Sequence, residues 1–246
     1  MPDHSRMKLG KKPRRYDRRT LRLARYLTPA LPPPPPGVTN SEGVTNWGMM
    51  LNDTLGDCTI AGVGHAIQVW TLAKGNEVTV SDSTVLLYYE QWDGYNPNNP
   101  ASDQGGVELD VLNDWRQSPN GLDGHQLLAF ADPDPQDTLH VQQAIRLFGG
   151  LYAGLQLPIS AQTQDVWDVA SGPNGQPGSW GGHCVFISDY AADTLTCITW
   201  GELKKMTWGF WGTYCDEAHA LLSTDWQPLA GFDMAALQAD LSKVTA

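Results

Sequence analysis

Apolar residues recur at helical spacing through the first half of the chain. After a loop rich in Gly, Asn and Asp at Asn46–Asp57, the apolar residues Ile60, Val63, Ile67 and Trp70 fall on one face of a helix. Periodicity and capping residues predict four helices, namely Cys58–Ala73, Ser81–Trp92 capped by Ser81 or Ser83, Val107–Trp115 and His140–Leu147.

The pattern changes in the second half of the chain. Short runs of β-branched and aromatic residues, bounded by Gly, Pro and Asp, are typical of strands. They predict strands at Leu151–Pro158, Cys184–Tyr190, Thr194–Trp200 and His219–Leu222. Helices followed by strands indicate an α+β protein of two lobes, with any active site between them.

The charge is distributed unevenly between the N-terminus and the rest of the chain. Residues 1–26 hold ten of the 16 Lys and Arg side chains and two acidic ones, so this arm carries +8 and the remainder −19. An acidic body has the wrong sign for phosphate, which argues against nucleic-acid binding. The arm is either a solvated tail or a pro-segment that docks on the acidic body.

The arm is expected to end in a proline-rich spacer. Arg18–Leu27 has some helical character, and Thr28–Gly37 is typical of a polyproline II linker, with an SH3-type ligand as the less frequent alternative. The sequence therefore divides into an arm and linker at 1–37 and a folded domain at 38–246.

Several features limit where the protein acts and what it binds. We expect no membrane span and no standard export signal, since the basic N-terminus is followed by prolines and not by an apolar segment. The four cysteines lack the spacing of a zinc site or a disulfide scaffold, which favours a reducing, cytoplasmic location without metal or cofactor.

The Asp- and Asn-rich stretch at 93–106 lacks the alternation of an EF-hand, so a loop at the edge of a cleft is the simpler interpretation.

Cys58 and His183 are the strongest candidates for chemistry. Cys58 follows a glycine-containing loop and opens a predicted helix, where free N–H groups favour a thiolate. His183 follows two glycines and begins an apolar strand. A thiol and an imidazole that meet across a cleft form a nucleophile and its general base. Taken alone, Cys58 is more often a small buried residue and His183 more often a histidine that caps a turn. His65 is expected to be a packed helix residue.

Segments around these residues resemble papain-like cysteine peptidases in order. NDTLGDCTIAG resembles the nucleophile segment, with the Cys–Thr pair of a divergent bacterial or phage type, and SDQGGVELDVLNDW resembles the glycine pair that binds substrate backbone. GGHCVFISDY is similar to the histidine strand, and ITWGELKKMTWGFWG to the element after it. The resemblance implies a two-lobed papain-like fold, with Gly105, Gly106, Gly182 and Trp200 lining the substrate site.

The chain departs from the family at three points. Asn52 stands where the family has a Gln that stabilises the oxyanion, and it is either a shorter donor or a turn residue. Ile198 stands where an Asn orients the histidine, unless a one-residue slip brings Thr199 to His183. The family's disulfides are absent, and we expect Cys184 and Cys197 to be buried thiols, possible neighbours on adjacent strands.

These observations favour a thiol hydrolase that cleaves peptides or proteins through an acyl-enzyme on Cys58. His183 is the expected base and acid, and the basic arm restrains activity by lying along the cleft or body. The acidic body hints at basic substrates. Two alternatives remain open, an inactive papain-fold binding protein and another acyl transferase or amidase on the same scaffold.

Overall fold

Three helices form one lobe of the molecule, around a central helix that begins at Cys58. The structure is a computed structural model and describes residues 3–226, 228 and 230–244. The lobe contains α1 (Cys58–Ala73), α2 (Asp82–Asp93) and α3 (Glu108–Gln117). Residues of α1 are buried all round from Cys58 to Thr71, as expected of a helix at the centre of a core.

A mostly antiparallel sheet forms the other lobe. In the part of the chain that the structure describes, its strands are ordered β1-β3-β9-β4-β6-β7-β8-β5, with β2 paired to β6. The strands are β1 (Leu21–Arg22), β2 (Val38–Thr39), β3 (Leu127–Asp132), β4 (Leu151–Leu157), β5 (Val166–Trp167), β6 (Gly181–Tyr190), β7 (Thr194–Thr199), β8 (Glu202–Thr207) and β9 (Cys215–Ser223). The remaining α-helices are α4 (Thr138–Phe148), α5 (Trp208–Tyr214) and α6 (Met234–Val244).

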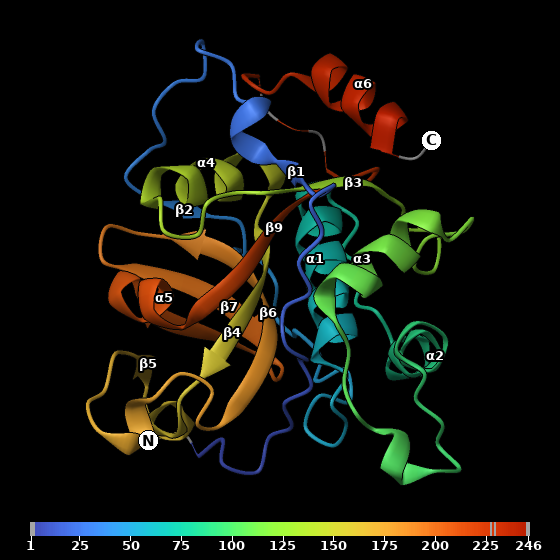
Figure 1. Cartoon of the computed structure of the whole chain (residues 1–246), viewed down its shortest axis with the longest axis vertical. Coiled ribbons are helices and arrows are strands. Elements are labelled where there is room, and N and C mark those ends of the chain that lie inside the picture. The colour runs from blue at the N-terminus through green and yellow to red at the C-terminus, as the bar shows by residue number, and fades with distance from the viewer. Residues whose placement is uncertain (1–2, 227, 229, 245–246) are drawn as a thin grey trace.

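The helical lobe and the sheet meet along α1 and β6 (Figure 1). Gly62 of α1 permits this contact, because a Cβ there would lie 3.0 Å from the Tyr152 ring of β4 and 3.2 Å from the Cys184 sulfur of β6. The Tyr152 hydroxyl donates a hydrogen bond to the backbone oxygen of Thr59. The first turn of α1 is therefore held against the beginning of β6.

The predicted α+β architecture of two lobes is confirmed, and most of the predicted elements are present. The limits of α1 agree at both ends, and Ser81, rather than Ser83, caps α2 by accepting the Thr84 N–H. The strand around His183 begins earlier than predicted, at Gly181, and the last predicted strand begins at Cys215. Among the described helices, none has the length and apolarity needed to cross a bilayer.

Two expectations from the sequence are wrong. The segment Arg18–Leu27 is not an α-helix, since β1 pairs in parallel with β3 and is followed by a short 3₁₀ helix at Leu23–Arg25. Backbone pairing with the sheet and burial of Leu23 outweigh the local helical pattern.

Cys184 and Cys197 are not opposite each other, because Cys197 pairs with Ile187. Both are nevertheless free, buried thiols, as predicted, and Cys58 and Cys215 are free and buried as well.

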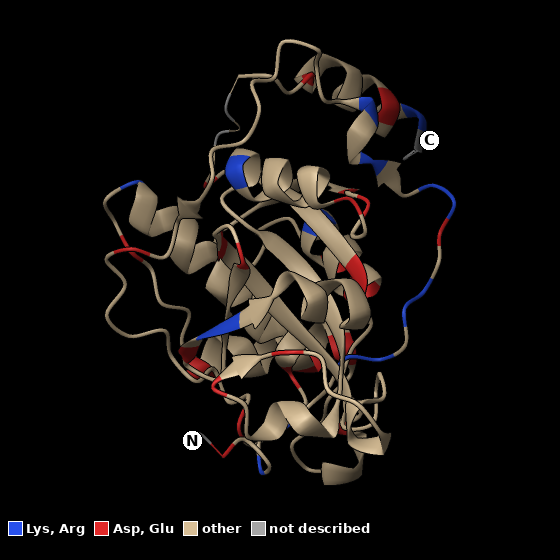
Figure 2. Cartoon of the chain, turned by 90° about the vertical axis from the view of Figure 1, so that its left-hand side faces the viewer, with Lys and Arg blue, Asp and Glu red and all other residues tan. Residues whose placement is uncertain are grey.

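The N-terminal arm packs against the rest of the molecule. Its first half passes between the helical lobe and the sheet, and the chain then continues into β1 (Figure 1). Figure 2 shows Lys and Arg gathered on this segment, with few of them elsewhere. Leu21, Leu23 and Tyr26 belong to the buried core of the sheet lobe. The arm therefore consists of a segment across the lobe boundary and an anchor built into the fold.

Candidate active site

Cys58 is the first residue of α1 and is completely buried. Its sulfur accepts a hydrogen bond from the backbone N–H of Cys184 at 3.4 Å, and the backbone of Gly10 in the arm is near enough to lower the pKa of the thiol. Burial raises the pKa of the Cys58 thiol to about 12, more than these two backbone groups lower it. Cys58 is therefore a neutral thiol while the arm covers it.

His183 lies near the start of β6, directly before the residue whose N–H contacts the Cys58 sulfur. Its Nε2 lies 2.6 Å from Oγ1 of Thr199, at the end of β7, and its ring stacks on Trp200 at 4.5 Å with an interplanar angle of 19°. Nδ1 is buried and has no hydrogen-bond partner. Burial, with a smaller contribution from His65, lowers the pKa of His183 to about 3, so the imidazole is neutral.

Thr199, and not Ile198, faces the imidazole. Adjacent residues of a strand point to opposite faces of the sheet, so only one of the two can reach His183. Ile198 is buried in the core shared with α1. This is the arrangement that the sequence analysis attributed to a one-residue slip.

Asn52 is buried, but its amide group is occupied within the loop before α1. Nδ2 lies 3.0 Å from Oδ1 of Asp57 and 3.4 Å from the backbone oxygen of Leu55, so both amide protons have acceptors there. Burial raises the pKa of Asp57 well above its ordinary value. The structure thus shows Asn52 stabilising the loop and does not direct its amide toward the Cys58 sulfur.

The arm makes backbone hydrogen bonds to two of the three glycines expected to bind substrate. Gly106 donates to the Gly10 carbonyl at 2.8 Å and accepts from the Lys12 N–H at 2.8 Å, and the Gly182 carbonyl accepts from the Lys11 N–H at 3.1 Å. The pairing of Lys11 with Gly106 is parallel.

Gly105, by contrast, donates its N–H to the Tyr89 hydroxyl, and a Cβ at this position would overlap the Gly10 carbonyl. Closer to the N-terminus, the carbonyl of Lys8 accepts a hydrogen bond from the indole N–H of Trp200. An extended segment of the chain's own arm therefore occupies the backbone-binding positions beside Cys58.

The stretch at 93–106 leads from the end of α2 to Gly105 and Gly106. The Asp93 carboxylate accepts a hydrogen bond from the Thr59 hydroxyl, and Oδ1 of Asp103 accepts from the Gly56 N–H and the Tyr89 hydroxyl. The carboxylate of Asp93 thus joins the end of α2 to α1, and that of Asp103 holds the loop to α2 and to the residues before α1.

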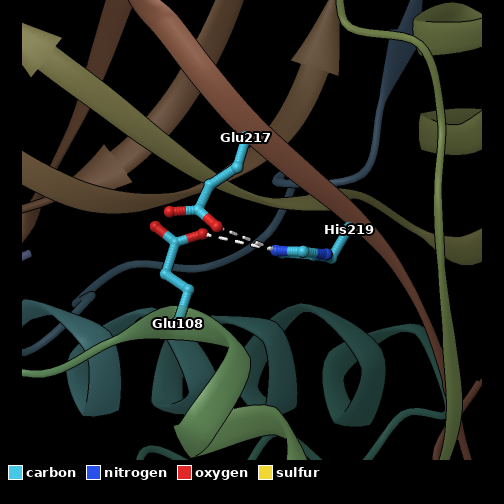
Figure 3. Close-up of side chains that lie close together, drawn as sticks. All are labelled: Glu108, Glu217 and His219. Carbon is cyan, nitrogen blue, oxygen red and sulfur yellow. Dashed lines mark ion pairs between the residues drawn. The ribbon is translucent and has the colours of Figure 1, made fainter. Parts of the chain in front are cut away.

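A buried cluster of charged residues, which the sequence analysis did not identify, lies beside the glycines. Figure 3 shows Glu108 of α3 facing Glu217 and His219 of β9. Nε2 of His219 lies 3.7 Å from Glu108 and 3.5 Å from Glu217, and its Nδ1 lies 2.6 Å from Asp132. The carboxylates raise the pKa of His219 to about 10, so the ring is an imidazolium.

Lys11 of the arm reaches into this cluster. Its side chain is fully buried, and Nζ lies 2.7 Å from Glu217 and 3.0 Å from Asp216. Opposing charges from three carboxylates raise the pKa of Lys11 above its ordinary value despite its burial. The sequence signal for the cluster was the spacing of Glu217 and His219, which places both on one face of a strand.

No protein-family model and no curated protein matches this sequence. Solved structures do match it. Xylellain, a cysteine protease from Xylella fastidiosa, is 12% identical with a TM-score of 0.65, over 90% of this chain and 98% of that one. Digestive procathepsin L 3 of Tenebrio molitor larval midgut is 11% identical with a TM-score of 0.60, over 89% and 76% of the two chains.

A third solved structure is the ragweed pollen allergen Amb a 11, a cysteine protease in its proform. It is 14% identical with a TM-score of 0.56, over 79% of this chain and 67% of that one. At such low identity, these similarities show a shared papain-like fold.

Proposed function

We propose that this chain, which has the papain-like fold, is a cysteine peptidase with Cys58 as nucleophile and His183 as general base and acid. The observation that carries the proposal is the pairing of His183 Nε2 with Thr199 at 2.6 Å. If Nε2 keeps its proton and donates it to the Thr199 hydroxyl, Nδ1 is the basic nitrogen, and Nδ1 has no other partner.

The proposed reaction proceeds through an acyl-enzyme. Nδ1 of His183 accepts the thiol proton, and the Cys58 sulfur forms a bond to the carbonyl carbon of the substrate. When the C–N bond breaks, the proton passes from Nδ1 to the leaving amine. Water then attacks the thioester and releases the acid and the free thiol. Trp200, stacked on the imidazole, limits access of water to it.

The backbone N–H of Cys58 is the proposed oxyanion donor. It is one of the first N–H groups of α1, which have no acceptor within the helix. One such donor contributes about 3 kcal/mol to lowering the barrier. Asn52 can add a second donor only if its amide leaves Leu55 or Asp57, since both of its protons are now engaged.

The arm holds this site in a latent state. The backbone of Gly10 lies near the Cys58 thiol, and its carbonyl oxygen accepts a hydrogen bond from the Gly106 N–H at 2.8 Å. Burial under the arm also keeps the thiol and imidazole neutral, whereas the reactive form of such a pair is the thiolate. Two of the similar structures are a procathepsin and a proform, which supports the comparison with an inhibitory pro-segment.

Labelling of Cys58 in the full chain tests the proposal. Gly10→Ala should displace the arm, because a Cβ at Gly10 would lie 1.7 Å from the Gly56 carbonyl oxygen, while the backbone of Gly10 suits any residue. An epoxide inactivator of thiol proteases, followed by mass spectrometry, should label G10A at Cys58 at least tenfold faster than the wild type. Peptide hydrolysis should rise in parallel.

Matched variants separate catalysis from mere exposure. Lys8→Ala, an exposed position of the same arm, should label like the wild type. Adding His183→Ala to G10A should abolish the fast labelling and the hydrolysis. If G10A reacts with iodoacetamide at Cys58 but neither labels with the epoxide nor cleaves peptides, the protein is a binding module and the proposal is wrong.

A further inference from the structure

We infer that the pocket formed by Glu108, Asp216 and Glu217 selects a substrate with a lysine or arginine side chain near the cleaved bond, and that Lys11 occupies it in the substrate's place. This inference rests on the proposed peptidase function. It assigns the substrate class that the site recognises.

The position of the pocket relates it to the reacting atoms. Lys11 follows Gly10, whose backbone lies near the Cys58 thiol. The Lys11 N–H donates a hydrogen bond to the Gly182 carbonyl, and Lys11 pairs with Gly106. A side chain carried by a peptide at this place in the cleft must enter the same pocket.

The pocket is built to hold a long, positively charged side chain. Gly154 of β4 creates the space, because a Cβ there would lie 2.0 Å from Cε of Lys11 and 2.8 Å from the Glu108 carboxylate. Gln156, on the same strand, donates a hydrogen bond to Asp216 at 2.7 Å and orients it toward Nζ. The methylene groups of Lys11 thus pack over Gly154, and its ammonium group lies among carboxylates.

Removing Lys11 takes away the cation that pairs with Asp216 and Glu217. Glu108 and Glu217 are 100% and 99% buried at the side chain. Their nearby cations are Lys11, whose Nζ lies 2.7 Å from Glu217, and His219, whose Nε2 lies 3.7 Å from Glu108 and 3.5 Å from Glu217. Without Lys11, His219 alone would balance these carboxylates and Asp216, and buried negative charge in excess of positive charge is costly. When the arm moves away, a basic side chain of a substrate restores the missing charge.

The cluster favours an ammonium or guanidinium group over a metal ion. Glu108, Glu217 and His219 have atoms close enough to one another to hold a metal. His219, however, is an imidazolium with Nδ1 held by Asp132, and a protonated ring nitrogen cannot coordinate a metal. Lys11 already shows the alternative, with two carboxylates in direct contact with its ammonium.

Chemical rescue tests the pocket without any need for activity. In full-length Lys11→Ala, n-butylammonium, which has the size and charge of the missing side chain, should raise the melting temperature by several degrees. Neutral n-butanol should not, and neither amine nor alcohol should stabilise the wild type. Gly154→Ala added to Lys11→Ala should abolish the effect of the amine. Zinc that stabilises Lys11→Ala where butylammonium does not would overturn the inference in favour of a metal site.

Substrate cleavage tests selectivity in the arm-displaced G10A protein. Peptides carrying Lys, its neutral isostere norleucine, or Glu at each of the three positions before the scissile bond should be compared by kcat/KM. At one position, Lys should exceed norleucine at least thirtyfold, and Glu217→Gln should reduce that ratio at least fivefold. Glu202→Gln is the matched control and should keep the ratio, because the Glu202 carboxylate pairs with His4 of the arm and belongs to a different ion pair from those of Lys11.

The possible outcomes separate the two proposals. Equal cleavage of Lys and norleucine peptides contradicts the pocket inference and leaves the peptidase intact. Rescue by butylammonium without cleavage of any peptide supports the pocket and contradicts the peptidase. Failure of rescue together with absence of a Lys preference rejects the inference outright.

Discussion

Thr199 contacts the proposed catalytic histidine through its side-chain hydroxyl. A hydroxyl beside one imidazole nitrogen orients the ring and favours one position for its proton. Because the threonine side chain is short, it must approach the imidazole closely. Oγ1 of Thr199, at the end of β7, lies 2.6 Å from Nε2 of His183.

Thr199→Val tests the role of this hydroxyl with almost no change in volume. The variant leaves the buried Nε2 without a partner, so in the G10A protein we expect peptide hydrolysis to fall by about tenfold to hundredfold, the range for losing a group that orients a ligand or base. The pH profile of kcat/KM should shift as the imidazole loses its fixed proton.

Thr199→Ser is the matched control for this prediction. It retains the hydroxyl and should keep most of the activity and the wild-type pH profile. Equal activity in the Val and Ser variants would mean that the hydroxyl does not position His183.

The candidate nucleophile and histidine could be selected from sequence because each stands at the start of an element with glycines before it. The role of Asn52 could not, since it depends on whether its amide turns toward Asp57 or toward the cleft. The charged pocket was missed because Glu108, Glu217 and Lys11 lie far apart in the chain. Only the fold places them together.

At the scale of elements, long and regular patterns predicted the structure best. The 16-residue α1 carries apolar residues at helical spacing, is buried from Cys58 to Thr71, and has the limits that were predicted. The strand β8 was not predicted because its sequence ELKKMT is largely charged, although Lys204 within it is buried. The helix α5 contains two glycines in seven residues, which lower its helix propensity.

The arm divides at about residue 20 into two elements with different roles. Residues before this point bond to the cleft, whereas β1 pairs with β3, and Leu23 and Tyr26 are fully buried or nearly so. The sequence suggested one continuous arm and linker over residues 1–37. Charge alone could not reveal the division, because Arg22 and Arg25 carry the basic pattern into the anchored half.

Leu23→Ala tests whether the second half of the arm is part of the core. Its side chain is completely buried, so its truncation should lower the free energy of unfolding by about 2–5 kcal/mol in urea titrations. Leu139→Ala, at a position that is 48% exposed on α4, should change it by less than about 0.5 kcal/mol. A Leu23→Ala protein as stable as the wild type would mean that this anchor does not contribute to folding.

At the scale of the whole molecule, opposite charges on both halves of the arm and on the body lie close together. Arg14 and Arg22 lie 3.5 and 3.6 Å from Asp132, and Arg15 pairs with Asp110. These arginines are partly or largely exposed, whereas the pair of Lys11 and Glu217 is buried. Salt screens exposed pairs far more than buried ones.

Salt should therefore loosen the arm of the wild-type protein without releasing it completely. Between 0.05 and 0.5 M NaCl, epoxide labelling of Cys58 should become a few times faster, and it should remain slower than in G10A. In G10A, where the arm is displaced already, labelling should be nearly independent of salt. A wild-type rate that does not change with salt would show that electrostatic attraction does not govern the docking of the arm.

The anchor at β1 also fixes the arm as a tethered ligand of its own cleft. A segment joined to its binding site acts at an effective concentration in the millimolar range, whatever the concentration of the protein. A cut between Lys12 and β1 would abolish this advantage, since the released peptide would then dissociate on dilution. A cut in the proline-rich linker would leave the tether to β1 in place, held by the sheet, so the location of the first cleavage decides whether opening the site is reversible.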